Sequence, residues 1–111
     1  MEVHMTASET TAMWGNDETS GVWAYNEQVP GPLIHAWKGD LVRVVFTNDL
    51  PEETTIHWHG LRIDDEMDGV PAIQDPIQPG ETFTYEFTPP DAGTYWYHPH
   101  VQAHEQIERG L

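Results

Sequence analysis

The sequence contains no cysteine, and this absence excludes several kinds of chemistry at once. Without thiols, the 111-residue chain can form no disulfide, no iron–sulfur cluster, no cysteine-rich zinc site and no blue-copper site with a cysteine ligand. Catalysis by a cysteine nucleophile is excluded on the same ground. A single domain of this length can nevertheless bury a core without covalent cross-links.

Basic residues are also scarce, with four Lys and Arg against 19 Asp and Glu and a net charge of −15. A chain this acidic is unsuited to neutralising nucleic-acid phosphates or binding an anionic membrane surface. No apolar run approaches the ~18 residues that a membrane-spanning helix needs. The first residues also lack the basic-then-apolar pattern of an export signal. We therefore expect neither nucleic acid nor a membrane among the partners.

Proline and glycine, nine of each, recur at short intervals and favour short strands joined by turns. The clearest expected strand covers residues 82–88, where apolar residues alternate with Thr and Glu. A second expected strand covers residues 41–46. Further strand candidates are residues 3–5, 22–25, 33–37, 54–59 and 94–98. Only residues 101–109 have apolar residues at helical spacing. The pattern predicts one all-β domain over residues 1–111, an antiparallel sandwich or Greek-key barrel with a short helix near the C-terminus.

Four of the seven histidines form two His-x-His pairs, His57 with His59 and His98 with His100. In a strand, residues i and i+2 point to the same face, so each pair presents two imidazoles about 7 Å apart along the backbone. One such pair can be an ordinary strand feature, but two pairs in aromatic-rich strands favour a metal site. If the strands lie side by side, the four imidazoles form a site suited to copper or zinc.

Five segments spread from residue 25 to residue 100 form a recognisable series. They are YNEQVPGPLI at 25–34, IHWHGL at 56–61, MDGVP at 67–71, QPGE at 78–81 and GTYWYHPH at 93–100. Their order and content resemble the N-terminal domain of multicopper oxidases of the laccase type, and the match extends over residues 22–111. The resemblance implies a cupredoxin-like Greek-key β-sandwich or barrel. Because the chain ends at Leu111, we expect this domain to lack its last strand.

The same resemblance implies copper as the cofactor and assigns a role to each paired histidine. His57 matches a ligand of the type 2 copper of the family. His59, His98 and His100 match ligands of the type 3 copper pair. Together they would supply half of a trinuclear cluster that reduces dioxygen to water.

Asp68 matches an acidic residue of the family that helps to deliver protons during oxygen reduction, and it is the candidate catalytic residue. The neighbouring acidic residues 64–66 are interpreted as a solvated loop. His4 and His35 are interpreted as ordinary strand residues. His104 is interpreted as a helix-surface residue, with a hydrogen bond to the copper ligands as the alternative.

In the family, the remaining cluster ligands and the blue copper come from another cupredoxin domain. We expect that domain in a longer version of this chain or in a partner subunit, which would also supply the missing strand edge. A cluster shared between chains would also fit a homotrimer. The expected substrates are dioxygen and a small-molecule or metal-ion reductant. The location implied by the family is the periplasm or the extracellular space.

Other functions remain open at the level of the sequence. Without a blue-copper site, the chain alone has no entry point for electrons, and we expect it to be inactive by itself. A copper-binding or copper-resistance cupredoxin module would use the same histidines without catalysis. A third reading is a structural fragment whose His pairs stay empty. A copper nitrite reductase is a weaker variant, because the two His pairs together point to oxygen reduction.

Overall fold

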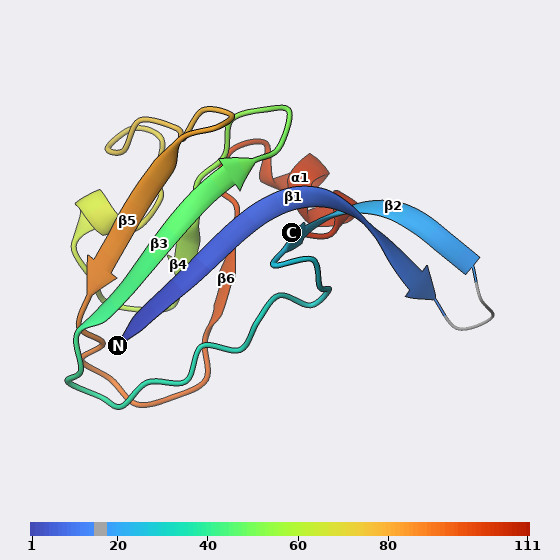
Figure 1. Ribbon diagram of the computed structural model, residues 1–111. Helices are drawn as coiled ribbons and strands as arrows, with labels where there is room; N and C mark the ends of the chain where they lie inside the picture. Colours follow the sequence, from blue (N-terminus) through green and yellow to red (C-terminus); the bar gives the residue numbers. More distant parts are fainter. Residues whose placement is uncertain (15–17) are drawn as a thin grey trace.

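Two β-sheets and one short α-helix account for most of the regular structure in this computed structural model, which describes residues 1–14 and 18–111 (Figure 1). The first sheet has the strand order β2-β1-β3-β5, and the second consists of β4 and β6. The elements are β1 (Glu2–Trp14), β2 (Glu18–Tyr25), β3 (Val42–Asp49), β4 (His57–His59), the 3₁₀ helix η1 (Asp65–Met67), β5 (Thr82–Phe87), β6 (Trp96–His98) and α1 (Ala103–Arg109).

The central strands of the first sheet follow from the alternation of apolar and polar residues. In β3, Val42, Val44 and Phe46 are buried. In β5, Tyr85 and Phe87 face the same core. The two strands pair in antiparallel register, with Val44 opposite Tyr85. The strands expected near residues 41–46 and 82–88 are therefore confirmed, since one face of each is needed to close the core.

Strand β1 differs from its expected place. A short strand was expected at residues 3–5, but β1 is thirteen residues long and lies between β2 and β3. It runs parallel to β3, with Val3 opposite Val44, so the sheet is mixed rather than purely antiparallel. Met5 and Ala7, at 1% and 0% exposure, anchor its inner face. The residues that follow are mostly small or polar and lack a clear apolar alternation, so the sequence does not reveal that the strand continues; pairing with β2 from Ala7 onwards extends it.

The strand expected at residues 33–37 is not formed. Leu33 and Trp37 are 91% and 76% exposed, while Ile34 and Ala36 pack against the core. The alternation is therefore real, but this segment makes no β-ladder. The hydroxyl of Tyr97 in β6 donates to the carbonyl of residue 32 at 2.7 Å and holds the segment instead. Side-chain contacts replace sheet pairing here.

The β4–β6 sheet lies behind the first sheet in the view of Figure 1 and covers the core from that side. The ring of Trp58 packs against Tyr85 and Phe87 of β5, with centroid distances of 5.6 and 4.9 Å. The ring of Tyr97 packs in the same way on Tyr25, at 5.3 Å. Because the middle residues of both strands point into the core, the residues on either side of them point to the opposite face.

Helix α1 confirms the helix expected near residues 101–109, but it buries a different face. The expected apolar stripe included Ile107, which is 38% exposed, whereas Gln106 is fully buried. The amide oxygen of Gln106 accepts a hydrogen bond from the hydroxyl of Thr54 at 2.8 Å. A polar contact thus docks the helix near β4. Within the described residues, no helix combines the length and hydropathy that a membrane crossing requires.

Candidate metal centre

The short β4–β6 ladder brings the two His pairs together. Its antiparallel register places His57 opposite His98 and His59 opposite Trp96. One ring nitrogen from each of His57, His59 and His98 lies within 4.8 Å of the other two. The geometric condition of the sequence interpretation, that the two strands lie side by side, is therefore met. We call these three residues the His cluster.

His100 lies two residues beyond His98, just past the end of β6, and its side chain is exposed. Its ring centroid is 5.2 Å from that of His57 and 6.5 Å from that of His98, stacked on the latter at 21°. The ring therefore adjoins the His cluster, although it is not one of the three residues whose ligand atoms converge.

Hydrogen bonds to main-chain carbonyls set the tautomers of two cluster histidines. Nδ1 of His57 lies 2.9 Å from the carbonyl oxygen of Asp68, and Nδ1 of His98 lies 2.7 Å from that of Pro99. A carbonyl can only accept, so each Nδ1 carries the hydrogen. In the neutral ring the other nitrogen, Nε2, then carries a lone pair; that of His98 faces Nδ1 of His59. Both rings thus have the protonation pattern of a metal-binding imidazole.

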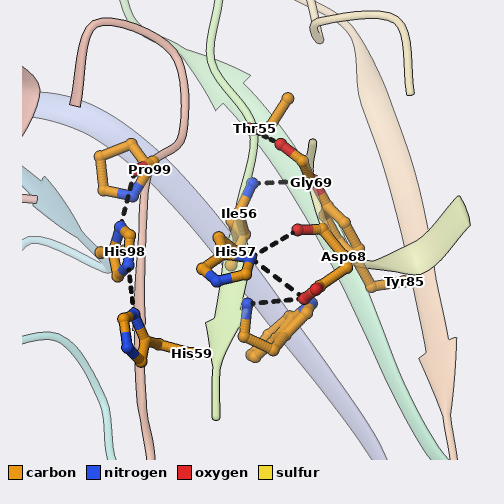
Figure 2. Close-up of polar contacts among 10 residues, drawn as sticks. Thr55, Ile56, His57, His59, Asp68, Gly69, Tyr85, His98 and Pro99 are labelled. Atoms are coloured by element: carbon orange, nitrogen blue, oxygen red, sulfur yellow. Dashed lines mark hydrogen bonds and ion pairs between the residues drawn. The ribbon is translucent and has the colours of Figure 1, made fainter. Parts of the chain in front are cut away.

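His59 and His98 face each other across the cluster, as Figure 2 shows. Nδ1 of His59 lies 3.2 Å from Nε2 of His98. Two imidazole nitrogens bound to one tetrahedral ion at about 2.0–2.1 Å would stand roughly 3.3 Å apart. The ring of Trp96 stacks on His59 at 5.0 Å and 26°, which helps to hold its orientation. This spacing and all-nitrogen donor set fit a copper ion, for which imidazole is a suitable ligand.

Burial also keeps His98 in the state that a metal ligand requires. Desolvation is the main cause that lowers the pKa of His98, and the nearby rings of His57, His59 and His100 lower it further. The hydrogen bond to the carbonyl of Pro99 acts in the opposite direction but is outweighed. Metal binding requires a neutral imidazole, so the lowered pKa favours binding at neutral pH.

Asp68 follows η1 and lies beside the His cluster, with its side chain 21% exposed (Figure 2). One oxygen, Oδ1, is 3.2 Å from Nδ1 of His57 and accepts the backbone N–H of Trp58 at 3.3 Å. The carboxylate therefore touches the candidate ligand and still reaches solvent. The acidic residues 64–66 are exposed, as expected for a solvated loop.

Three residues that sequence analysis did not assign to the site, Thr55, Gly69 and Tyr85, fix the start of β4 or the loop at residues 68–69 beside it. The hydroxyl of Tyr85 accepts the N–H of Ile56 at 2.8 Å, and the hydroxyl of Thr55 donates to the carbonyl of Gly69 at 2.6 Å. A Cβ on Gly69 would lie 2.1 Å from the carbonyl oxygen of Ile56. The available sequence signals were the inward place of Tyr85 in its alternating strand and the position of Gly69 in the MDGVP segment.

The remaining histidines described by the structure lie outside the His cluster. His4 is exposed and contacts Glu2 at 3.1 Å. His35 lies beside Trp37, with a ring distance of 6.2 Å. His104 is exposed on α1. His4 lies in β1, as expected, whereas His35, also expected in a strand, lies in the segment that makes no β-ladder. All three histidines are exposed.

Comparisons with known proteins agree with this geometry. A family model described as multicopper oxidase matches residues 6–111. The multicopper oxidase MmcO of Mycobacterium tuberculosis is 49% identical over 77 residues, which is 69% of this chain and 15% of the relative. Copper resistance protein A of Pseudomonas syringae pv. tomato is 39% identical over 108 residues, which is 96% of this chain and 16% of the relative. The chain thus spans only a small part of these relatives.

Solved structures show the same fold. The multi-copper oxidase of Pseudomonas thermotolerans superposes with a TM-score of 0.96 at 44% identity, covering 100% of this chain and 27% of that one. The multicopper oxidase of Campylobacter jejuni, described as a metallo-oxidase, superposes with a TM-score of 0.90 at 37% identity, covering 99% of this chain and 24% of that one. The expected all-β, cupredoxin-like architecture is confirmed.

Proposed function

This chain belongs to the multicopper oxidase family, whose cofactor is copper, and we propose that it acts as the first cupredoxin domain of a laccase-like oxidase. In this proposal His57 is a type 2 copper ligand, and His59, His98 and His100 are ligands of the type 3 pair. The observation that carries the proposal is the convergence of three ring nitrogens within 4.8 Å across the β4–β6 ladder.

Bound copper supplies the one-electron chemistry by which dioxygen is reduced to water. The contribution of this chain is to hold neutral imidazoles in fixed orientations and to provide protons beside them. The carbonyl of Asp68 fixes the tautomer of His57. The Oδ1 atom of Asp68, close to His57 and partly open to solvent, is the group that would hold and deliver a proton.

A second cupredoxin domain would supply the remaining cluster ligands and the blue copper that receives electrons from a small-molecule or metal-ion reductant. The much greater length of the relatives supports such a domain in the complete protein. A partner subunit, including an arrangement as a homotrimer, would serve the same purpose. Membership of this family and similarity to copper resistance protein A support a periplasmic or extracellular location.

Titration of the purified chain with Cu²⁺, followed by calorimetry and electron paramagnetic resonance, tests the metal site. We expect His98→Ala to lose most of the binding, because His98 lies in the ladder and faces both other cluster rings. The matched control is His104→Ala, an exposed helix residue outside the cluster, which should bind like the wild type. Equal binding by His98→Ala and the wild type would overturn the proposal.

The isolated chain should show no turnover of phenolic laccase substrates even when loaded with copper, because it contains no cysteine for a blue-copper site. Oxidation of such a phenol by the purified, copper-loaded chain would contradict this part of the proposal.

A copper-binding module without catalysis is the second candidate, favoured by the similarity to copper resistance protein A over 96% of the chain. The affinity of the isolated chain for Cu²⁺ distinguishes an oxidase domain from a non-catalytic copper-binding module. A half-cluster should bind Cu²⁺ with a Kd of about 1 μM or weaker, whereas a self-sufficient storage site should reach about 1 nM.

A further inference from the structure

Within the described residues, the outer edge of β4 is completed by side chains rather than by another strand. The N–H of Ile56 is accepted by the hydroxyl of Tyr85 at 2.8 Å, and the N–H of Trp58 is accepted by Oδ1 of Asp68 at 3.3 Å. Ile56 and Trp58 flank His57, so the backbone on both sides of this candidate ligand is fixed by side-chain acceptors.

Tyr85 reaches this edge from β5 and contacts both neighbours of His57 without touching its ring. Its hydroxyl bonds the main chain of Ile56, and its ring lies edge-on to Trp58 at 5.6 Å. The hydroxyl also accepts Nε2 of Gln74 at 3.2 Å. Tyr85 itself is fully buried. It therefore ties β4 both to β5 and to the chain that follows the loop at residues 68–69.

The hydroxyl of Tyr85 is neutral at neutral pH, and its pKa is raised. Burial is the main cause that raises the pKa of Tyr85 to about 12, and the nearby charge of Asp68 contributes in the same direction. The hydroxyl that accepts the N–H of Ile56 is therefore protonated at neutral pH. Without that acceptor, the N–H of the fully buried Ile56 would lose its partner.

We propose that Tyr85 is a positioning residue for the copper site: its hydroxyl fixes the backbone of β4 so that His57 is held against Asp68 with Nε2 free for metal. This inference rests on the proposed function of the His cluster. It differs from a core-packing role, because the ring alone would fill the core, whereas positioning requires the hydroxyl.

Comparison of the variants Tyr85→Phe and Tyr97→Phe distinguishes a positioning role of the Tyr85 hydroxyl from a packing role of its ring. Both variants lose one hydroxyl and keep a ring that packs on Trp58 at a centroid distance of 5.6 Å. The hydroxyl of Tyr97, however, donates to the carbonyl of Pro32, away from β4. Unfolding in urea measures the loss of stability in each variant. The change in metal affinity of each variant can then be compared with its loss of stability.

The readouts are Zn²⁺ affinity by calorimetry and the ¹⁵N chemical shifts of the imidazole rings, which report the tautomer of His57. We expect Tyr85→Phe to weaken Zn²⁺ binding by about tenfold, the lower end of the loss seen when a direct hydrogen-bond partner of a ligand is removed, because Tyr85 acts on His57 through Ile56. We also expect the two tautomers of His57 to mix. Tyr97→Phe should change the affinity by less than about twofold. Equal affinities and an unchanged His57 tautomer in Tyr85→Phe would overturn the inference.

Amide hydrogen exchange in the unaltered chain gives a second test, which does not depend on the folding of any variant. If the Tyr85–Ile56 bond and the metal site are coupled, Zn²⁺ must slow exchange at Ile56 more than at Leu50, whose N–H bonds to Asn48 at 3.0 Å. Equal slowing at both amides would count against positioning. Failure of the unaltered chain to bind Zn²⁺ or Cu²⁺ would instead overturn the proposed function.

Discussion

Gly69 lies where the loop after η1 passes against β4. Its φ is +70°, and a Cβ there would lie 2.1 Å from the carbonyl oxygen of Ile56 and 3.0 Å from the nitrogen of His57. Only glycine combines this backbone conformation with so close an approach. The proximity of Asp68 to His57 therefore depends on a neighbour that has no side chain at all.

We expect Gly69→Ala to lower the free energy of unfolding by at least about 2 kcal/mol, since the left-handed conformation costs ~1–2 kcal/mol and the contact adds to it. The control is Gly80→Ala: its φ is +86°, and a Cβ placed there would have no other heavy atom within 4 Å. This variant therefore isolates the cost of the backbone conformation. Urea unfolding gives both values, and Cu²⁺ titration should show weakened binding only for Gly69→Ala. Similar losses of stability in the two variants would argue against the close approach.

The candidate ligands could be predicted from the sequence because their signal is local. Two residues that are two positions apart in a strand point to the same face of the sheet, and this does not depend on the rest of the chain. Tyr85 could be placed on the inward face of its strand for the same reason. Its hydroxyl bond to Ile56 could not, because that contact joins residues 29 positions apart and depends on how two sheets pack.

At the scale of elements, helix α1 is docked by an amide rather than by an apolar stripe. The side-chain nitrogen of Gln106 donates to the carbonyl of Glu53 at 2.9 Å and to the carboxylate of Glu52 at 3.1 Å. Its oxygen accepts the hydroxyl of Thr54 at 2.8 Å. The helix follows the His98–His100 pair, and Thr54 precedes the His57–His59 pair. This network therefore joins the two chain segments that carry the candidate ligands.

Gln106→Leu should lower the free energy of unfolding by about 2–4 kcal/mol, because burying a polar group without its partner costs ~1–3 kcal/mol. The control Gln78→Leu removes an exposed amide that also bonds Glu53, at 2.8 Å, and should change stability by no more than about 0.5 kcal/mol. Amide exchange should accelerate in α1 of Gln106→Leu and stay slow in β3. Unchanged exchange in α1 would show that the network does not dock the helix.

Pairing between elements was harder to predict than the elements themselves. The expected strands near residues 41–46 and 82–88 formed, since each has a clear apolar face. Residues 33–37 have a similar alternation, yet they make no ladder. Strand β1 has a weak pattern but lies inside the sheet. Which segments find partners is decided by contacts across the whole fold, which a local pattern does not contain.

At the scale of the whole molecule, buried tyrosines govern the response to alkaline pH. Burial raises the pKa of Tyr85 and of Tyr97 to about 12, and that of Tyr25 well above its usual value. A raised pKa in the folded state means that the unfolded chain loses these protons first. The stabilisation is therefore complete below pH ~10 and is lost as the pH rises from ~10 towards ~12.

We expect the free energy of unfolding to be flat from pH 8 to pH 9.5 and to fall above that, with a contribution of about 2–3 kcal/mol from Tyr85 by pH 12. Urea unfolding at a series of pH values, together with absorbance at 295 nm for tyrosinate, measures both events. Tyr85→Phe should show a shallower decline than the wild type. Free energies that do not fall between pH 9.5 and pH 11.5 would contradict this prediction.

The β4–β6 ladder has three residue pairs, with aromatic side chains in the middle pair and imidazoles on either side. Moving β4 by a single position would turn Trp58 out of the core and the imidazoles of His57 and His59 into it. Core formation and assembly of the metal ligands therefore require the same alignment. An ion bound between His59 of β4 and His98 of β6 would be held only when the two strands are correctly aligned, so metal binding would stabilise the native register of the ladder.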